Sequence, residues 1–403
     1  MTISPSASAS PGPATGWSLQ ADKVGLPIGL GIALALWVLP FATLKANRIV
    51  AGEAHGFLDA LPPGSGMMLL LAILATAAAF AFRLPSTLRL IGALAGTAGL
   101  CLAIGLAPDH LAPSDNPYAR VSPASGFWTA FFLMTLALAD ALTRKRPGPA
   151  FRLALLAGVG ALSLLFLGTG FFDGLSVMKE FAARADTFWA EGARHLSLAF
   201  GSMGIAIAIG IPFAILAERW PVLRGPVLNA LNIVQTVPSI ALFGLLIAPL
   251  GWIALHVPGA AAIGVRGIGI APALVALTLY SLLPVVGNTL AGFAGVSPAA
   301  KDAATGIGMT RRQRLLRVEL PLALPVILVG IRIVLVQNIG LATIAALIGG
   351  GGFGVFVFQG LGQNATDLVL LGALPTVILA FATAVVLDAA IEVSSPAKGR
   401  LAS

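Results

Sequence analysis

Charged side chains are scarce in this chain. Asp, Glu, Lys and Arg make up only 10% of its 403 residues, whereas 58% of the residues are hydrophobic. The mean hydropathy of +0.95 is far above that of a chain that buries one apolar core beneath a charged surface. The lack of charge therefore excludes an ordinary soluble domain and points to a protein of the membrane.

Cysteine and histidine are also rare. Cys101 is the single cysteine, so an intrachain disulfide is excluded. Four histidines lie far apart in predicted external loops, where we expect solvated side chains and no metal site: His55, His110, His195 and His256. An intramembrane hydrolase would need paired Asp, His or Ser inside the apolar runs, whereas Asp140 and Asp388 lie near predicted helix ends. We therefore predict no catalytic residues.

The sequence lacks a nucleotide cradle. The dipeptide Gly-Lys does not occur, so the P-loop pattern that holds the phosphates of ATP is missing. Residues 349–354, GGGGFG, formally match a dinucleotide-binding pattern, but they follow an apolar run and lack the strand and helix that the pattern needs. We interpret this segment as a flexible external loop, and we expect the chain itself to bind no cofactor.

Long apolar runs, in contrast, are abundant. A helix of about 20 apolar residues spans the ~30 Å hydrocarbon layer, and about ten runs approach that length. Their approximate limits are 24–43, 67–82, 88–107, 124–142, 153–172, 196–217, 226–248, 268–294, 322–348 and 365–391. The sequence thus predicts an all-α polytopic membrane protein with about ten transmembrane helices.

The basic residues predict the orientation of these helices. If the N-terminus is cytoplasmic, the inside loops hold 16 of the 24 Lys and Arg residues, the outside loops hold seven, and Arg332 lies within a span. This excess follows the positive-inside rule, so the net charge of +8 reflects membrane topology rather than nucleic-acid binding. Both termini are predicted to be cytoplasmic.

The chain divides into segments of different character. Residues 1–22 are rich in Ser, Pro, Ala and Gly, and we expect a disordered cytoplasmic tail. The segments after it are an N-terminal hydrophobic block of about five transmembrane helices (23–172), an external amphipathic connector (173–195), a second block of about five helices (196–391) and a cytoplasmic tail (392–403). No chemical motif occurs before the second block, so we expect the second block to carry the function.

Charge concentrates in one predicted cytoplasmic loop, residues 297–321, which holds seven of the 40 charged residues. Ser297 followed by proline is a typical start of a helix, and the glycines at 306 and 308 can end it. Thr310 with Gln313 matches a capping box and predicts a second short helix. The loop is therefore expected to form two short helices outside the membrane.

This loop resembles the "EAA" loop of ABC importer permeases, whose pattern is Glu-Ala-Ala, three residues, Gly, nine residues, Ile, one residue and Leu-Pro. The matching residues are Asp302, Ala303, Ala304, Gly308, Val318, Leu320 and Pro321, with Asp in place of Glu and Val in place of Ile. The resemblance implies a coupling helix that docks into a groove of a cytoplasmic ATPase. Ala303 and Ala304 are small enough for a partner to approach closely. The last five spans then resemble the core of a type I ABC importer permease.

Within that family, residues 196–391 are similar to the osmoprotectant group, which moves glycine betaine, choline, proline and related solutes. The resemblance implies a permease of the cell inner membrane that works with ATPase subunits using ATP and Mg²⁺, an external substrate-binding protein, and a second permease copy or sister permease. The N-terminal block resembles the hydrophobic extension of a longer subgroup. The alternatives are a permease of the same importer class for another small solute, an amino acid or a sulfonate-like compound, a secondary transporter, or a scaffold protein.

Polar side chains inside the second block are candidates for a translocation path. They are Gln235, Ser239, Tyr280, Ser281, Asn288, Arg332, Gln337 and Asn338. A charge inside a span is costly, so Arg332 marks a functional site or a structural ion pair, and the neutral groups equally fit interhelical hydrogen bonds. Aromatic cages bind quaternary amines, and we find no aromatic cluster in the second half. Selectivity is therefore expected to lie mainly in the binding protein.

The predicted topology has a direct test. A cysteine introduced at position 312 should react with an impermeant maleimide only from the cytoplasmic side, because residue 312 lies in the basic loop. A cysteine at position 115 should react only from outside. Labelling of intact cells and inverted vesicles distinguishes the two sides, and the reverse pattern at either position would overturn the helix count.

Overall fold

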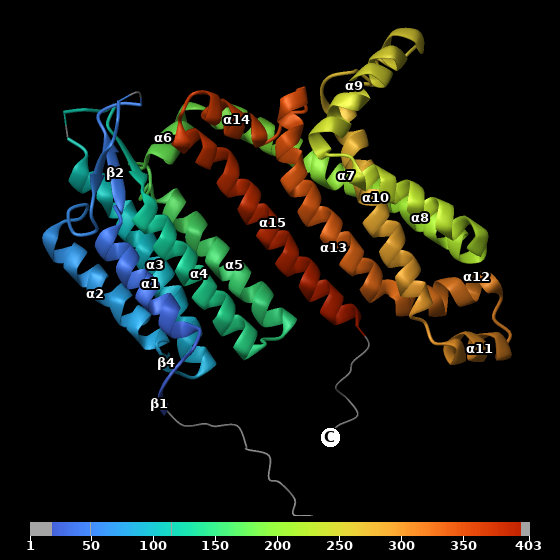
Figure 1. Cartoon of the computed structure of the whole chain (residues 1–403), viewed down its shortest axis with the longest axis horizontal. Coiled ribbons are helices and arrows are strands. Elements are labelled where there is room, and N and C mark those ends of the chain that lie inside the picture. The colour runs from blue at the N-terminus through green and yellow to red at the C-terminus, as the bar shows by residue number, and fades with distance from the viewer. Residues whose placement is uncertain (1–17, 49, 114, 396–403) are drawn as a thin grey trace, which may run out of the picture. The chain divides into compact units, whose positions relative to one another are not determined.

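The computed structural model describes residues 18–395 apart from residues 49 and 114 (Figure 1). The two predicted tails therefore lie almost entirely outside the described residues. Contacts divide the chain into two compact units. The first contains residues up to 147 together with 167–176, and the second contains residues 148–166 together with the chain from 177 onward.

The predicted fold class is confirmed, since the described residues are mainly helical. Nine of the described helices are long and apolar enough to cross a membrane. A further apolar helix, α1 (Gly25–Val38), has 14 residues and is about 21 Å long at 1.5 Å per residue, so it is shorter than the hydrocarbon layer. The prediction of about ten spans thus agrees with the structure to within this one short helix.

The first unit packs four helices against one another in sequence order: α1, α2 (Pro63–Phe80), α3 (Ser86–Leu111) and α4 (Ser125–Lys145). Two small antiparallel sheets, which the sequence analysis does not predict, accompany them. One sheet pairs β1 (Ser18–Ala21) with β4 (Phe82–Arg83). In the other sheet, β2 (Ala42–Lys45) lies between β3 (Glu53–His55) and β5 (Arg120–Pro123). The sheets satisfy backbone groups of the segments between the apolar helices.

Four charged side chains join one end of α1, α3 and α4 in the first unit. Arg89 is 1% exposed, and its guanidinium lies 3.4 Å from the carboxylate of Asp22 and 2.9 Å from that of Asp140. Arg144 contacts both carboxylates at 2.9 Å. Burial alone would raise the pKa of Asp22, but the Gly25 N–H and the two guanidinium groups hold it below its usual value. Asp140 is therefore a partner in an ion network that joins α3 and α4.

The second unit contains the remaining helices. They are α5 (Pro149–Gly168, of which residues 149–166 group here), α6 (Ser176–Ala183), α7 (Ala185–Arg219), α8 (Pro221–Thr236), α9 (Ser239–His256), α10 (Ile270–Ala294), α11 (Pro298–Gly306), α12 (Arg311–Arg314), α13 (Leu320–Ile344), α14 (Gly354–Gly362) and α15 (Thr366–Ser394). A π-helical turn, Leu315–Glu319, precedes α13, and a 3-10 turn, Ala345–Ile348, follows it. The core forms where α10 and α13 pack against α7, and α15 packs on α13.

Two elements differ from the predicted limits. The apolar run predicted over 226–248 is two helices, because the chain leaves the helical conformation at Val237, whose ψ is 127°, just before Pro238. The segment predicted as a connector, 173–195, is divided between α6 and the first turns of α7, which continues without a break to Arg219.

Candidate functional site

The loop between α10 and α13 forms the two predicted short helices, which are labelled at the end of α10 in Figure 1. The Ser297 hydroxyl accepts a hydrogen bond from the Ala300 N–H at 3.3 Å and begins α11. Thr310 and Gln313 form both bonds of the predicted capping box, at 3.3 and 2.9 Å. Gly308 takes a φ of +82°, which a side chain would strain, so this glycine makes the turn between the helices.

The first half of the motif presents one exposed surface. Asp302, Ala303 and Gly308 are exposed, and Ile307 is 75% exposed although it is apolar. The expectation that Ala304 lies on the same surface is wrong, because Ala304 is only 4% exposed within this chain. The Met309 N–H donates to the Ala304 carbonyl at 3.1 Å, so the turn folds back over this residue. Ala303 and Ile307 therefore form the surface that a partner can reach.

The second half of the motif lies at the π-helical turn. Val318 and Leu320 are half-buried and Pro321 is exposed. Glu319, between them, is 7% exposed and accepts a hydrogen bond from Arg314 Nε at 2.7 Å. The sequence analysis misses this pair because it looks for partners three or four residues apart, as in an α-helix. In a π-helix, residues five apart are neighbours.

Two candidates for the translocation path are fully buried hydrogen-bonding groups. Asn338 is 0% exposed and its amide donates at 2.8 Å to the hydroxyls of Ser202 and Ser281. These three side chains come from α13, α7 and α10, so they join the three central helices of the second unit. Ser202 is absent from the sequence-based candidates, since a single serine in an apolar run gives no signal. In this conformation the group connects helices, and all three side chains are shielded from the surface.

Two other candidates connect α10 to the break between α8 and α9. Pro284 lacks the N–H that would bond the carbonyl of Tyr280 within α10, and Gln235 Nε2 donates to that carbonyl at 2.9 Å. The Tyr280 hydroxyl in turn donates to the Val237 carbonyl at the break. Each side therefore satisfies a backbone carbonyl of the other: the Tyr280 carbonyl that Pro284 leaves free, and the Val237 carbonyl at the break before Pro238.

The remaining candidates lie apart from these groups. Arg332 on α13 forms an ion pair with Asp388 on α15, and both side chains are more than a third exposed. The Asn288 amide bonds the Pro284 carbonyl of its own helix at 2.8 Å. Gln337 and Ser239 are half-buried, and no hydrogen bond of their side chains is recorded in the described part of the chain. The structure thus divides the eight candidates among several places rather than one pocket.

The glycine-rich segment 349–354 is held by α7 rather than free. Gly352 N–H donates to Glu191 Oε2 at 2.6 Å, and Phe353 N–H donates to His195 Nδ1 at 3.3 Å. Glu191 is 7% exposed and also bonds Arg194 at 2.8 Å, and His195 is 0% exposed. The prediction that His195 is solvated is therefore wrong, because α7 begins earlier than expected and carries this residue into the core.

Aromatic rings gather beside this segment. The ring centroid of Phe188 lies 5.1 Å from that of Phe181 and 5.2 Å from that of Phe353. The exposed ring of Trp189 packs against Phe188, with the two centroids 5.4 Å apart. The second unit therefore contains an aromatic cluster, which sequence analysis of the second half did not predict because the rings come from segments far apart in the chain. In the described structure these rings pack against one another.

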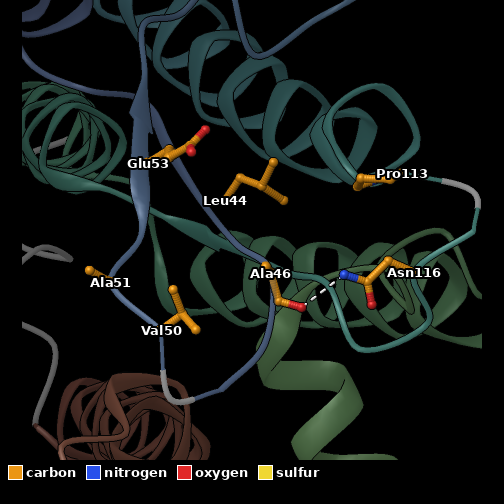
Figure 2. Close-up of a pocket in the computed structure, with 7 residues that line it drawn as sticks. All are labelled: Leu44, Ala46, Val50, Ala51, Glu53, Pro113 and Asn116. Atoms are coloured by element: carbon orange, nitrogen blue, oxygen red, sulfur yellow. Dashed lines mark hydrogen bonds between the residues drawn. The ribbon is translucent and has the colours of Figure 1, made fainter.

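A small pocket in the first unit lies beside β2 and β3 and is shown in Figure 2. Asn116 donates to the Ala46 carbonyl at 2.9 Å across one side, and Glu53 supplies the only charge among its lining residues. No group of three metal-ligating side chains occurs among the described residues. We assign no function to this pocket.

Two family models match the chain. Residues 22–178 match the model described as "ABC transporter permease YehY, N-terminal domain". Residues 206–400 match the model described as "Binding-protein-dependent transport system inner membrane component". The second match contains the loop 297–321 and all eight polar candidates.

Curated relatives resemble the second half. Over 187 residues the chain is 44% identical to the osmoprotectant import permease protein OsmW of Salmonella typhimurium, an alignment that covers 46% of this chain and 82% of the relative. It is 35% identical over 203 residues to the choline transport system permease protein OpuBB of Bacillus subtilis, covering 50% and 86%. Among solved structures, a chain of the MetNI methionine ABC transporter in an inward facing conformation aligns with a TM-score of 0.45 and 22% identity, covering 53% of this chain and 96% of that one.

The contact between the glycine segment and α7 predicts the effect of adding one methyl group. A Cβ at Gly351, whose φ is +77°, would lie 2.6 Å from Glu191 Oε2, so Gly351→Ala should destabilise the fold by about 1–3 kcal/mol. Thermal unfolding of the purified chain in detergent measures the loss. Gly362→Ala is the matched control, because nothing lies within 4 Å of its added Cβ. Equal melting temperatures for the two variants would contradict the proposed contact.

Proposed function

Since this chain belongs to the family of binding-protein-dependent transport system inner membrane components, we propose that it is the permease of an importer for quaternary-amine osmoprotectants such as glycine betaine and choline. The loop 297–321 carries the proposal. Its first capped helix, α11, presents Ala303 and ends at the exposed Ile307, outside the spans. Asp302, Ala303, Ala304 and Gly308 keep the spacing of the "EAA" pattern. In this proposal the loop docks into a cytoplasmic ATPase.

The energy for transport comes, in this proposal, from separate subunits. Two ATPase subunits bind ATP and Mg²⁺ and contact the loop, and an external binding protein delivers the solute. A second permease, either another copy or a sister chain, completes the membrane part. In this proposal the chain lies in the cell inner membrane. The positive-inside rule supports an orientation with both termini and the loop in the cytoplasm, which requires the short helix α1 to cross the membrane as well.

The substrate class is supported by the relatives, whose names include osmoprotectant, choline and carnitine transport. In this proposal the chain itself adds little selectivity, and the aromatic rings near Phe188, which pack against one another, serve to hold the fold. We therefore assign the main discrimination to the binding protein. An importer for another small solute, such as an amino acid, is the second candidate within the same family.

The translocation path, in this proposal, runs between α9, α10 and α13. Gln337, Asn288 and Ser239 are half-buried and can reach a passing solute without losing interhelical bonds. The groups around Asn338 and Tyr280 are bonded between helices in the present conformation. They become part of the path only if those bonds exchange partners during transport.

Docking through Ile307 has a measurable consequence. Ile307→Asp places a charge on the exposed apolar surface and should weaken association with the ATPase by about 2–4 kcal/mol. Co-purification of the ATPase from membranes measures retention, and uptake of labelled glycine betaine by the reconstituted complex measures transport. Both should fall together.

The matched control for this variant is Ile263→Asp. Ile263 is 82% exposed, similar to Ile307, but it lies in the predicted external loop before α10. We expect full ATPase retention in this control. Normal retention in Ile307→Asp would remove the docking assignment, whereas normal docking without uptake of glycine betaine by the unaltered complex would remove the substrate assignment alone.

A further inference from the structure

The chain passes from the loop into α13 through one turn of π-helix. The Leu320 N–H bonds the Leu315 carbonyl, so this turn contains one more residue than an α-helical turn. A π turn is less favourable than an α turn and is seldom kept without a compensating contact. Here the turn lies directly between the exposed docking helices and a span, where such a contact would also transmit movement.

One side chain holds the turn to both short helices. Arg314 is the last residue of α12, and its Nε donates to Glu319 at 2.7 Å. Its Nη1 also donates to the Thr305 hydroxyl near the end of α11, at 3.2 Å. Glu319 is 7% exposed, so its carboxylate depends on Arg314 for a charged partner.

α13, which follows the π turn, carries Asn338 of the buried hydrogen-bonding group. Asn338 lies 19 residues after Glu319 on α13, which is about 29 Å along a continuous helix. Its amide bonds Ser202 on α7 and Ser281 on α10. A tilt of α13 imposed at its cytoplasmic end therefore acts on the bonds that join the three central helices.

We propose that Arg314 is a positioning residue that makes α11, α12 and the start of α13 move as one body, so that movement of the docked ATPase reaches the spans. This inference rests on the proposed docking of the loop. Arg314 does not itself contact the ATPase in this account; its two acceptors, Thr305 and Glu319, both belong to this chain. Loss of Arg314 should therefore separate docking from transmission.

The test uses the complete complex of this chain with its ATPase in nanodiscs. Arg314→Gln removes the ion pair, and Arg317→Gln is the matched control. Arg317 lies in the same π turn, is exposed, and has no ion-pair partner in the described part of the chain. Both variants remove one positive charge from the loop, so they differ only in the contacts that Arg314 makes.

Two measurements distinguish transmission from docking. Co-purification measures ATPase retention. The response of α13 is followed by a cysteine at Gly340, in a chain whose Cys101 is replaced by Ser. Gly340 is exposed, and nothing lies within 4 Å of an added Cβ. The rate of its reaction with a water-soluble maleimide is compared with and without ATP plus vanadate.

We expect full ATPase retention in all variants. The maleimide rate should change with ATP in the unaltered chain and in Arg317→Gln. In Arg314→Gln the ATP-dependent change in maleimide rate should be about tenfold smaller, because the Arg314–Glu319 ion pair no longer holds the π turn. Uptake of labelled glycine betaine should fall in parallel.

Three results would overturn the inference. The first is an ATP response of Arg314→Gln equal to that of Arg317→Gln. The second is loss of the ATPase from Arg314→Gln, which would make Arg314 part of the docking surface or of loop folding. The third is the absence of an ATP response at position 340 in the unaltered chain. If Arg314→Gln does not insert, Thr305→Val removes one acceptor on an exposed helix and is judged by the same results.

These outcomes are separable from failure of the proposed function. Ile307→Asp tests docking alone, because this side chain makes no bond to the π turn. Retention of the ATPase in Ile307→Asp counts against the docking loop itself. Loss of the ATPase there, combined with an unchanged ATP response in Arg314→Gln, counts against the positioning role only.

Discussion

Lipid offers no hydrogen bonds, and this constraint explains the main polar contacts of the second unit. Pro284 frees the carbonyl of Tyr280 within α10, and the break before Pro238 frees that of Val237. A side chain donates a hydrogen bond to each of these carbonyls: Gln235 Nε2 to that of Tyr280, and the Tyr280 hydroxyl to that of Val237. The two prolines therefore also fix where neighbouring helices meet.

The loop 297–321 follows different rules, because it lies outside the predicted spans. Its helices are too short to be stable alone, and local caps at Ser297 and Thr310 define their ends. Arg314 then attaches both helices to the buried Glu319 at the start of α13. A surface suited to a cytoplasmic partner is thus connected to a span that carries the buried Asn338.

The sequence predicts correctly those features that depend on residues close together in the chain. Apolar runs give nearly all spans, and the spacing of Thr310 and Gln313 gives the capping box. Contacts between distant segments escape such analysis: Glu191 and Gly352 are 161 residues apart, and His195 and Phe353 are 158 apart. The burial of Ala304 escapes it too, because it depends on how the turn at Gly308 folds back over α11. The sequence motif identifies the loop, whereas the structure identifies which of its residues a partner can touch.

The central claim is that this loop is the place where the ATPase binds. Amide hydrogen exchange of this chain, measured with and without the ATPase, tests it most directly. The account predicts slower exchange in residues 298–314 on ATPase binding and no change in the loop between α9 and α10, residues 257–269. Unchanged exchange in 298–314, together with protection elsewhere on the chain, would contradict it.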